Sequence, residues 1–526
     1  MKKPVFILII LLVCCHCFGL EKKQHTYSDE QLLSDTAFDA RCEFALSQLP
    51  MCKGAGMSPE TQREDPRPYW VDTIVSQPEG YLTDAYGNVE ISTSDGLVWL
   101  ASVVNGLNGC EPDDFRGRTV RLTDDIDFGE DGWDLCFSPV GTRETPFTGT
   151  FDGGGHTIHH MLQYYSIYDG VNNYYFDMGI FGYIRNAVVK DLALDSTCSI
   201  ISNCNYPGYY RGGVVGFADS LSVVDNIYVY SPRGFISHVY GSGIVGMNRN
   251  STVRNCALKG RTAAPENGAT LVAYNRSEGG YADAVVENCY SHGQPGSSFS
   301  TWYAGGLVCF NQTASDNNGK QAIIRNCHST PTNDLVGYSA QGAFAAVLSE
   351  GSRIDHCYYD PTWCQHPKMV GLNQGGELLY CSEYTNVDGT GTLALPVTVN
   401  GILTDNLLDA LNLWIEEQDC PELYRTWAML TDTVPVFGGY HVGVHENGAG
   451  TENVTVYPNP ADGIVTVTGK ALRQAEVFNA AGQCTATATG TEDEIRIDLR
   501  QLPAGVYFVT VTDSEGRKCV KKVVKE

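Results

Sequence analysis

Six carboxylates gather in one short stretch of the chain, where they could bind a metal ion. Their spacing does not fit an EF-hand loop, and Gly129 stands where such a loop would need a ligand. Aspartates also cap turns between short strands. We therefore expect turn capping, keep a structural calcium ion as the alternative, and expect no other cofactor. The carboxylates are Asp124, Asp125, Asp127, Glu130, Asp131 and Asp134.

A glycine-rich phrase over residues 152–156 begins with Asp152 and ends with His156. Both side chains suit hydrogen bonds within a turn, and we expect that role rather than an acid/base pair. His159 and His160 have no assigned partner. The chain has no GxSxG, HExxH or phosphate-binding loop, and no CxxC pair or suitably spaced histidine indicates zinc. The sequence assigns no catalytic or metal-binding residue and favours a non-enzymatic protein.

Aromatic residues cluster between residues 164 and 210, in stretches that the pattern indicates are loops. Aromatic side chains in loops on a rigid scaffold suit contact with sugars or proteins. They could equally pack against the side of the scaffold. The candidate ligand-binding residues are Tyr164, Tyr165, Tyr174, Tyr175, Tyr209 and Tyr210.

The elements that must position these side chains come from a repeat between about residues 179 and 360. Its cleanest copy is GIVG at 243–246 followed by VRNCAL at 253–258. Equivalent positions in six copies are residues 192, 227, 256, 289, 327 and 357, so the steps are 35, 29, 33, 38 and 30 residues. A period in this range, carried by short β-branched runs and glycine turns, indicates a stacked solenoid.

Each copy contains two apolar runs that are too short for amphipathic helices, which favours a parallel β-helix. Stacked rungs about 4.8 Å apart would pair every strand with its neighbours. The alternative is a set of unrelated strands in a sandwich. We expect the varying steps to fall in loops, at residues 274–284 and 311–322. One inward column would contain Leu192, Ile227, Cys256, Cys289, Cys327 and Cys357, with Asn255, Asn288 and Asn326 at the adjoining turn.

The N-terminus has the pattern of an export signal: Lys2 and Lys3, an apolar run over residues 5–13, and small residues at Cys17 and Gly19. A lipoprotein signal is the alternative. No second apolar run approaches membrane-spanning length, so we expect no transmembrane span in the mature chain. The chain has 35 basic and 61 acidic residues, a net charge of -26, which argues against nucleic acid and anionic membranes as partners.

Three of the 19 cysteines lie in the signal, which leaves 19 − 3 = 16 in an exported chain that permits disulfides. The cysteines of the inward column are expected to stay buried and reduced as small apolar fillers. Sequence alone does not fix connectivity. The candidate disulfide pairs are Cys42/Cys52, Cys110/Cys136, Cys198/Cys204 and Cys364/Cys381.

A phrase over residues 147–158, FTGTFDGGGHTI, follows a helix expected over residues 95–105 with Ser94 as its N-cap and a strand that ends in Asp-Ile-Asp. This order resembles the opening rungs of right-handed, pectin-lyase-like β-helices. The copies after it resemble the GLUG motif. The resemblance covers about residues 81–360, but Ala273, Cys309 and Val347 replace the second glycine of the motif in three rungs.

The last part of the chain, residues 451–526, shows short alternating strands that indicate a small antiparallel, Ig-like sandwich. Its phrases resemble the C-terminal sorting domain of type IX secretion cargo. That resemblance implies the type IX machinery as partner and removal of the domain at the cell surface. The residues that carry it are Tyr457, Pro458, Asn459, Pro460, Leu502, Pro503, Gly505, Lys521 and Lys522.

The expected organisation is an all-β protein with a right-handed parallel β-helix followed by this sandwich. The expected segments are a signal (1–19), a leader (20–80), the β-helix (81–360), a cap with a helix over 407–415 (361–438), a linker (439–450) and the sorting domain (451–526). These resemblances imply a secreted or outer-membrane surface protein that binds host or matrix glycans or proteins as an adhesin does. The alternatives are a polysaccharide lyase or glycoside hydrolase on the same fold, which needs two carboxylates about 5–10 Å apart in a groove, and a structural surface protein.

Overall fold

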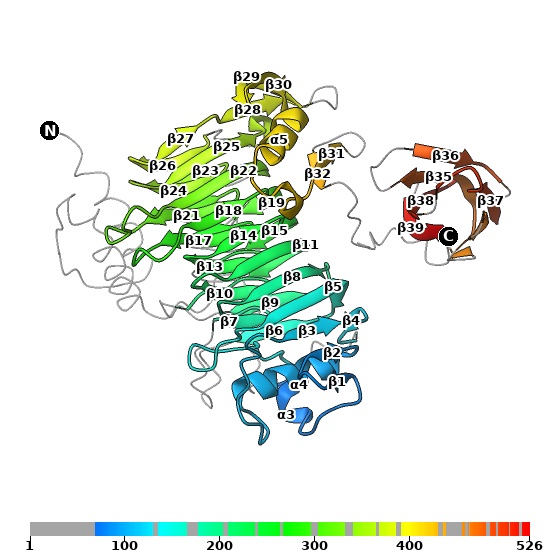
Figure 1. Cartoon of the computed structure of the whole chain (residues 1–526), viewed down its shortest axis with the longest axis horizontal. Helices are drawn as coiled ribbons and strands as arrows, with labels where there is room; N and C mark the ends of the chain where they lie inside the picture. The colour runs from blue at the N-terminus through cyan, green and yellow to red at the C-terminus, as the bar shows by residue number, and fades with distance from the viewer. Residues whose placement is uncertain are drawn as a thin grey trace, which may run out of the picture. The chain divides into compact units, whose positions relative to one another are not determined.

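The computed structural model describes two folded parts of the chain, a β-solenoid and a C-terminal sandwich (Figure 1). The predicted signal, most of the leader and the linker lie outside the described residues. The described ranges are 69–129, 135–165, 177–202, 209–236, 240–263, 267–295, 303–331, 340–363, 368–385, 391–429, 435–437, 455–457, 461, 463–479, 484–490, 493–503, 505–514 and 518–525.

The solenoid begins with a small helical end. The short helix α3 (Trp70–Thr73) precedes the antiparallel hairpin of β1 (Tyr81–Thr83) and β2 (Val89–Ile91), and α4 (Ser94–Asn105) follows. The N-cap of α4 is Thr93, whose side chain accepts a hydrogen bond from the Gly96 amide, so the cap lies one residue before the predicted Ser94. The apolar face of α4 packs into the solenoid core and closes this end of the stack (Figure 1).

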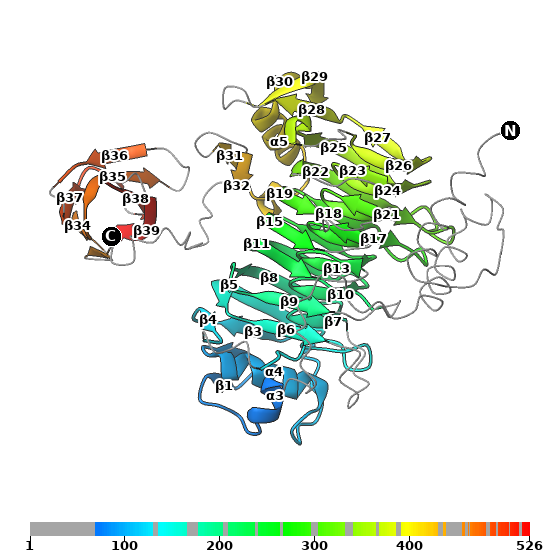
Figure 2. The same ribbon diagram turned by 180° about the vertical axis from the view of Figure 1, so that it is seen from behind.

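Parallel strands stack into rungs from β3 onward, as the repeat predicted (Figure 2). One side of the rungs is a large sheet that contains β3 (Thr119–Leu122), β4 (Ile126–Asp127), β5 (Thr150–His159), β6 (Leu162–Tyr165), β8 (Val188–Leu194), β9 (Ser199–Ser202), β11 (Val223–Ile236), β14 (Thr252–Arg254), β15 (Ala257–Ala263), β18 (Ala284–Glu287), β19 (Tyr290–Pro295), β22 (Ala322–Pro331), β25 (Arg353–Tyr359) and β27 (Glu377–Leu379).

The other long side is a seven-stranded parallel sheet of β7 (Phe181–Arg185), β10 (Val215–Asp219), β13 (Val245–Arg249), β17 (Val272–Ser277), β21 (Val308–Thr313), β24 (Ala345–Ser349) and β26 (Val370–Gln374). A short sheet of β12 (Tyr240–Gly241), β16 (Asn267–Ala269), β20 (Tyr303–Gly305) and β23 (Ala340–Gly342) completes the rungs.

The register keeps like residues above one another despite unequal steps. Val286 of β18 pairs with Ile324 of β22 even though the loops between the two strands of their rungs are long. These loops lie between β17 and β18 and between β21 and β22, where the sequence predicted insertions. The ladder therefore absorbs length changes outside the paired strands.

The predicted cysteine column is confirmed. Cys256, Cys289, Cys327 and Cys357 are fully buried, and the backbone amide of Cys256 donates to the sulfur of Cys289 at 3.4 Å. Burial raises the pKa of these thiols, so they stay protonated fillers. The column continues upward through Ile227, which pairs with Leu192.

The candidate disulfides are wrong wherever the structure describes their cysteines. Cys110 and Cys136 do not form a disulfide with each other. Cys198 and Cys381 are free thiols, and Cys381 continues the inward column, where its thiol donates to a backbone carbonyl. Spacing in the sequence suggested these pairs, but the rung geometry assigns their side chains to the core. The remaining candidate cysteines lie outside the described residues.

The predicted turn asparagines form a hydrogen-bonded ladder. Asn255, Asn288 and Asn326 have φ of 54°, 49° and 49°, in the left-handed region that asparagine tolerates. The amide of Asn288 donates to Asn255 at 2.8 Å, and that of Asn326 donates to Asn288 at 2.9 Å. The turn is therefore held by side chains as well as by the strands.

The segment after the last rung, predicted to be a cap, first extends that rung and then runs along the side of the solenoid. β28 (Ser382–Thr385), β29 (Thr392–Val399) and β30 (Ile402–Asn406) form an antiparallel extension. Then α5 (Leu407–Glu416), capped by Asn406, and the hairpin of β31 (Trp427–Met429) and β32 (Pro435–Phe437) lie along the side of the solenoid (Figure 1). We call residues 407–437 the side cap.

The C-terminal part is an antiparallel sandwich, as predicted. One sheet contains β33 (Thr455–Tyr457), β34 (Ile464–Thr468) and β37 (Glu494–Asp498). The other contains β36 (Cys484–Ala488), β35 (Leu472–Asn479), β38 (Gly505–Asp513) and β39 (Lys518–Lys525), and the two sheets enclose one apolar core. No helix in the described parts of the chain is long and apolar enough to cross a membrane.

Candidate functional site

The outward side of the seven-stranded sheet, which we call the open face, carries a row of large side chains. Ala218 of β10 belongs to the solenoid core, so its neighbours Phe217 and Asp219 lie on the opposite side of the strand. Parallel pairing aligns equivalent residues on successive rungs. The apolar row is Tyr183, Phe217, Met247, Tyr274, Phe310 and Val347, and each of these side chains is buried, with between 1% and 5% exposure.

The aromatic members of this row stack on one another. The ring centroids of Tyr183 and Phe217 are 4.9 Å apart, and those of Tyr274 and Phe310 are 4.6 Å apart. Tyr210 contacts both Phe217 and Tyr274 edge-on, at 5.4 and 5.6 Å, and so bridges the gap at Met247. Such contacts fix the rings in defined orientations.

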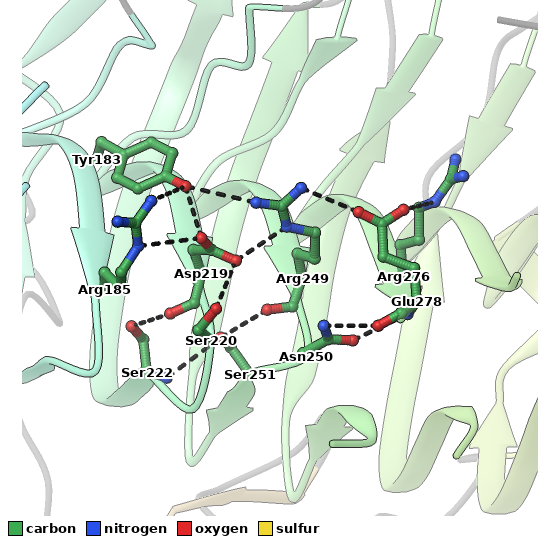
Figure 3. A network of polar contacts seen from close by, with 10 residues as sticks. All are labelled: Tyr183, Arg185, Asp219, Ser220, Ser222, Arg249, Asn250, Ser251, Arg276 and Glu278. Atoms are coloured by element: carbon green, nitrogen blue, oxygen red, sulfur yellow. Dashed lines mark hydrogen bonds and ion pairs between the residues drawn. The ribbon is translucent and has the colours of Figure 1, made fainter. Parts of the chain in front are cut away.

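Charged side chains form a second row on this face, and Tyr183 hydrogen-bonds to it (Figure 3). Asp219 accepts hydrogen bonds from the Tyr183 hydroxyl at 2.6 Å and from Arg249 Nε at 2.9 Å, and Arg185 Nε lies 3.4 Å away. Arg249 also donates to Glu278 at 2.9 Å. Burial would raise the pKa of Asp219, but the bonds from Arg249 and Tyr183 lower it, so this carboxylate stays ionised.

A further ion pair lies at the N-terminal end of the open face. Arg143 donates through Nε and one terminal nitrogen to the two oxygens of Asp177, at 2.8 and 3.0 Å. Burial alone would lower the pKa of Arg143, but the paired carboxylate raises it. The Arg143 guanidinium also lies 5.0 Å from the ring centroid of Tyr209 and 5.4 Å from that of Phe217.

The two kinds of charge lie at different depths. The side chains of Asp177 and Asp219 are 2% and 4% exposed, whereas those of Arg143 and Arg185 are 41% and 43% exposed. Solvent at this part of the open face therefore meets guanidinium groups and the half-buried Tyr209 and Tyr210, with the carboxylates and the ring of Phe217 beneath them.

The predicted tyrosines divide into three groups. Tyr209 and Tyr210 are half-buried on the open face, in contact with Arg143 and Phe217. Tyr164 and Tyr165 belong to β6, where they pair with Ile201 and Ser202 of β9. Tyr174 and Tyr175 lie outside the described residues.

Three histidine–aspartate pairs, which we call the His–Asp corner, lie near the end of β5. Nδ1 of His156 is 3.1 Å from Asp125. Nδ1 of His160 is 2.8 Å from Asp127, and Nδ1 of His159 is 2.7 Å from Asp195. The bond to Asp195 outweighs burial and raises the pKa of His159. His159 and His160 had no predicted partner in the sequence.

Two aspartates of this region cap turns, as expected: Asp127 accepts from the amide of Gly129, and Asp152 from that of Gly154. Asp125 instead bonds across rungs and accepts from the amide of Thr157, 32 residues away. His156 hydrogen-bonds to Asp125 rather than to Asp152. Among the described residues, no group of three His, Cys, Asp or Glu side chains could hold a metal ion. Glu130, Asp131 and Asp134 lie outside the described residues.

The described residues of the predicted sorting motif belong to the sandwich. Tyr457 ends β33, and Gly505 begins β38. The hydroxyl of Tyr507 donates to the carbonyl of Pro503 at 2.8 Å, which fixes the turn that contains Leu502. Lys521 and Lys522 lie in the edge strand β39 and pair with β38. Residues 458–460 lie outside the described residues.

Comparison with known proteins supports the predicted sorting domain. Residues 455–526 match the model of a family described as the secretion system C-terminal sorting domain. A type IX sorting domain implies export, to the cell surface or the medium. Comparison with curated proteins gave no match.

One solved structure shows a distant likeness. It is described as the crystal structure of a putative immunoglobulin A1 protease from Bacteroides ovatus, with 14% sequence identity and a TM-score of 0.42. The match covers 68% of this chain and 93% of that one. A likeness at this level has no bearing on function, and the GLUG and pectin-lyase-like resemblances stay predictions.

Proposed function

We propose that this exported protein acts as an adhesin and that its solenoid binds a glycan or protein ligand through the open face. The observation that supports this is the combination of half-buried tyrosines with partly exposed guanidinium groups on and beside one sheet. Tyr209 and Tyr210 offer ring edges, and Arg143 and Arg185 offer planar hydrogen-bond donors. Arg185 lies on a stacked strand, and ion-pair and ring contacts hold Arg143, Tyr209 and Tyr210, so these groups lose little conformational freedom when a ligand binds.

Binding arrays of glycans and matrix proteins test this proposal on the full-length chain. A double variant, Tyr209→Ala with Arg185→Gln, should lower affinity for a captured ligand at least about tenfold, because hot-spot aromatic and arginine side chains commonly contribute more than 1 kcal/mol each. Tyr86→Ala is a matched control, because Tyr86 is 85% exposed in the turn between β1 and β2. Equal losses in both variants, or no ligand on any array, would remove the support for the open face.

A polysaccharide lyase or hydrolase is the second candidate, and the His–Asp corner favours it. A carboxylate that raises the pKa of a histidine suits general acid or base catalysis near neutral pH. Release of reducing sugar from acidic polysaccharides, abolished by His159→Gln and unchanged by Tyr86→Ala, would support this candidate. A protein that neither binds a ligand nor cleaves a polysaccharide would instead fit a structural surface protein.

A further inference from the structure

The two ends of the solenoid differ in how they are covered. At the first rungs, Leu97, Leu100 and Val104 of α4 are buried against the core. At the last rung, β26 pairs only with β24, and β27 pairs only with β25. Among the described residues, no strand pairs with the outer edges of β26 and β27, so their backbone donors and acceptors on that side have no strand partner.

The last residues of the stacked apolar rows are exposed to solvent at this edge. Leu378 pairs with Ile354, a fully buried core residue, yet Leu378 is 44% exposed. Leu372 pairs with Val347, which is 4% exposed, but is itself 42% exposed. Tyr380 stacks on His356 at 4.7 Å and is 57% exposed. A solenoid end in this state is a template for further strand pairing.

The charge pattern indicates what can approach this edge. Glu377 is the single charged residue from position 369 to position 382, in a chain of net charge -26. Two copies of an acidic chain repel each other over most of their surfaces. They repel less where this edge of one copy, with its low charge, meets the same edge of another.

The cover over the first rungs determines how two copies of the chain could associate. Stacking head to tail would need a free strand edge at both ends, and α4 with the β1–β2 hairpin occupies the first one. Pairing of like ends about a two-fold axis needs only the open end, and it closes as a dimer without forming a fibre.

We propose that the last rung is a homodimer interface, in which β26 pairs antiparallel with β26 of a second copy about Leu372. This register sets Val370 opposite Gln374, and no charged residue of the strand faces its like. The open ends then meet, and each covers the exposed Leu378 and Tyr380 of the other. The dimer presents two open faces, so a polymeric ligand would bind with higher avidity than it does to one copy.

Sedimentation velocity of the full-length chain over a range of concentrations tests this proposal. We expect a reversible monomer–dimer equilibrium. Leu372→Lys should shift it to monomer, because a lysine on an edge strand opposes pairing. Leu221→Lys is the matched control: Leu221 is 63% exposed between β10 and β11, away from the last rung, and this variant should dimerise as the unchanged chain does.

Hydrogen exchange of the β26 amides in the unchanged chain tests the interface without a variant, so a folding defect in Leu372→Lys does not affect this measurement. In the unchanged chain these amides should exchange faster on dilution into the monomer range, while those of β13 stay protected. A chain that is monomeric at all concentrations overturns the proposal, and protected β26 amides in that monomer would mean that a segment of the same chain covers the edge. A dimer that Leu372→Lys leaves intact also overturns it.

Discussion

The solenoid has two long flanks that both carry ladders of polar side chains and differ in what lies over those ladders. At the turn flank, the asparagine ladder is covered by the side cap: Asn255 donates to the carbonyl of Leu423, and Asn326 to that of Leu411. At the open face, an equally regular ladder of charges remains partly exposed. The difference teaches that a stacked row of polar side chains can fasten another part of the chain or be left available to a ligand, according to what lies over it.

The covered flank should be the more sensitive to mutation. Trp427 of the side cap donates through its indole nitrogen to Asn288 at 2.8 Å and packs against Tyr290, His328 and Phe437. Trp427→Ala should lower the free energy of unfolding by about 3–5 kcal/mol, measured by urea denaturation. Hydrogen exchange should rise first in residues 407–437. A loss below about 1 kcal/mol would mean that the side cap is not fastened at this residue.

The open face should be sensitive only at its buried carboxylates. Asp219→Ala removes a side chain that is 4% exposed and leaves Arg249 and Tyr183 without their shared partner, and it should cost about 2–4 kcal/mol. Asp219→Asn keeps the shape and serves as the milder comparison. Denaturation curves that match those of the unchanged chain would show that solvent replaces the carboxylate.

Acid should loosen the covered flank in particular. Burial lowers the pKa of His328 from 6.5 to about 3, and its Nε2 donates to the carbonyl of Pro435 in the side cap. The unfolded chain therefore binds this proton more readily, and stability present above pH 6.5 is lost as the pH falls towards 3. We expect a loss of about 2 kcal/mol between pH 7 and pH 5 from this residue.

The variant His328→Gln isolates this effect. A glutamine can donate to the same carbonyl but does not titrate. The variant should therefore lack this part of the pH dependence in denaturation experiments. If the two chains lose stability in parallel as the pH falls, other groups are responsible.

The exposed layer of the open face should matter least to folding. Arg185→Gln removes a 43% exposed member of the charged row and should change the free energy of unfolding by less than about 1 kcal/mol. A ligand that uses this face should nevertheless bind more weakly to the variant. A large loss of stability would instead place Arg185 among the structural residues.

Residues in the repeating phrase were predictable because their roles follow from periodicity. The cysteine column and the turn asparagines stand at fixed places in each copy, and like positions must stack in a solenoid. An inner ladder was missed although it shows the same signal. Asn248, Asn275 and Asn311 join through side-chain bonds of 2.7 Å inside the core.

The candidate site was less predictable because its contacts cross rungs. His156, His160 and His159 bond to aspartates 31, 33 and 36 residues away, which is about one repeat. A search for polar partners at that separation would have paired them. The path of the side cap was not predictable in this way, because residues 407–437 lie outside the repeat and their position follows from packing with the finished solenoid.

The unequal loops between paired strands have a consequence for how this protein can diversify. Val286 and Ile324 keep their register beside loops of different length. Changes in the loops can therefore be selected separately from changes in the stacked strands. Insertions at the rim can accumulate rung by rung while the stacked strands remain unchanged. The loops can thus change in length and composition while the stacked strands keep their register.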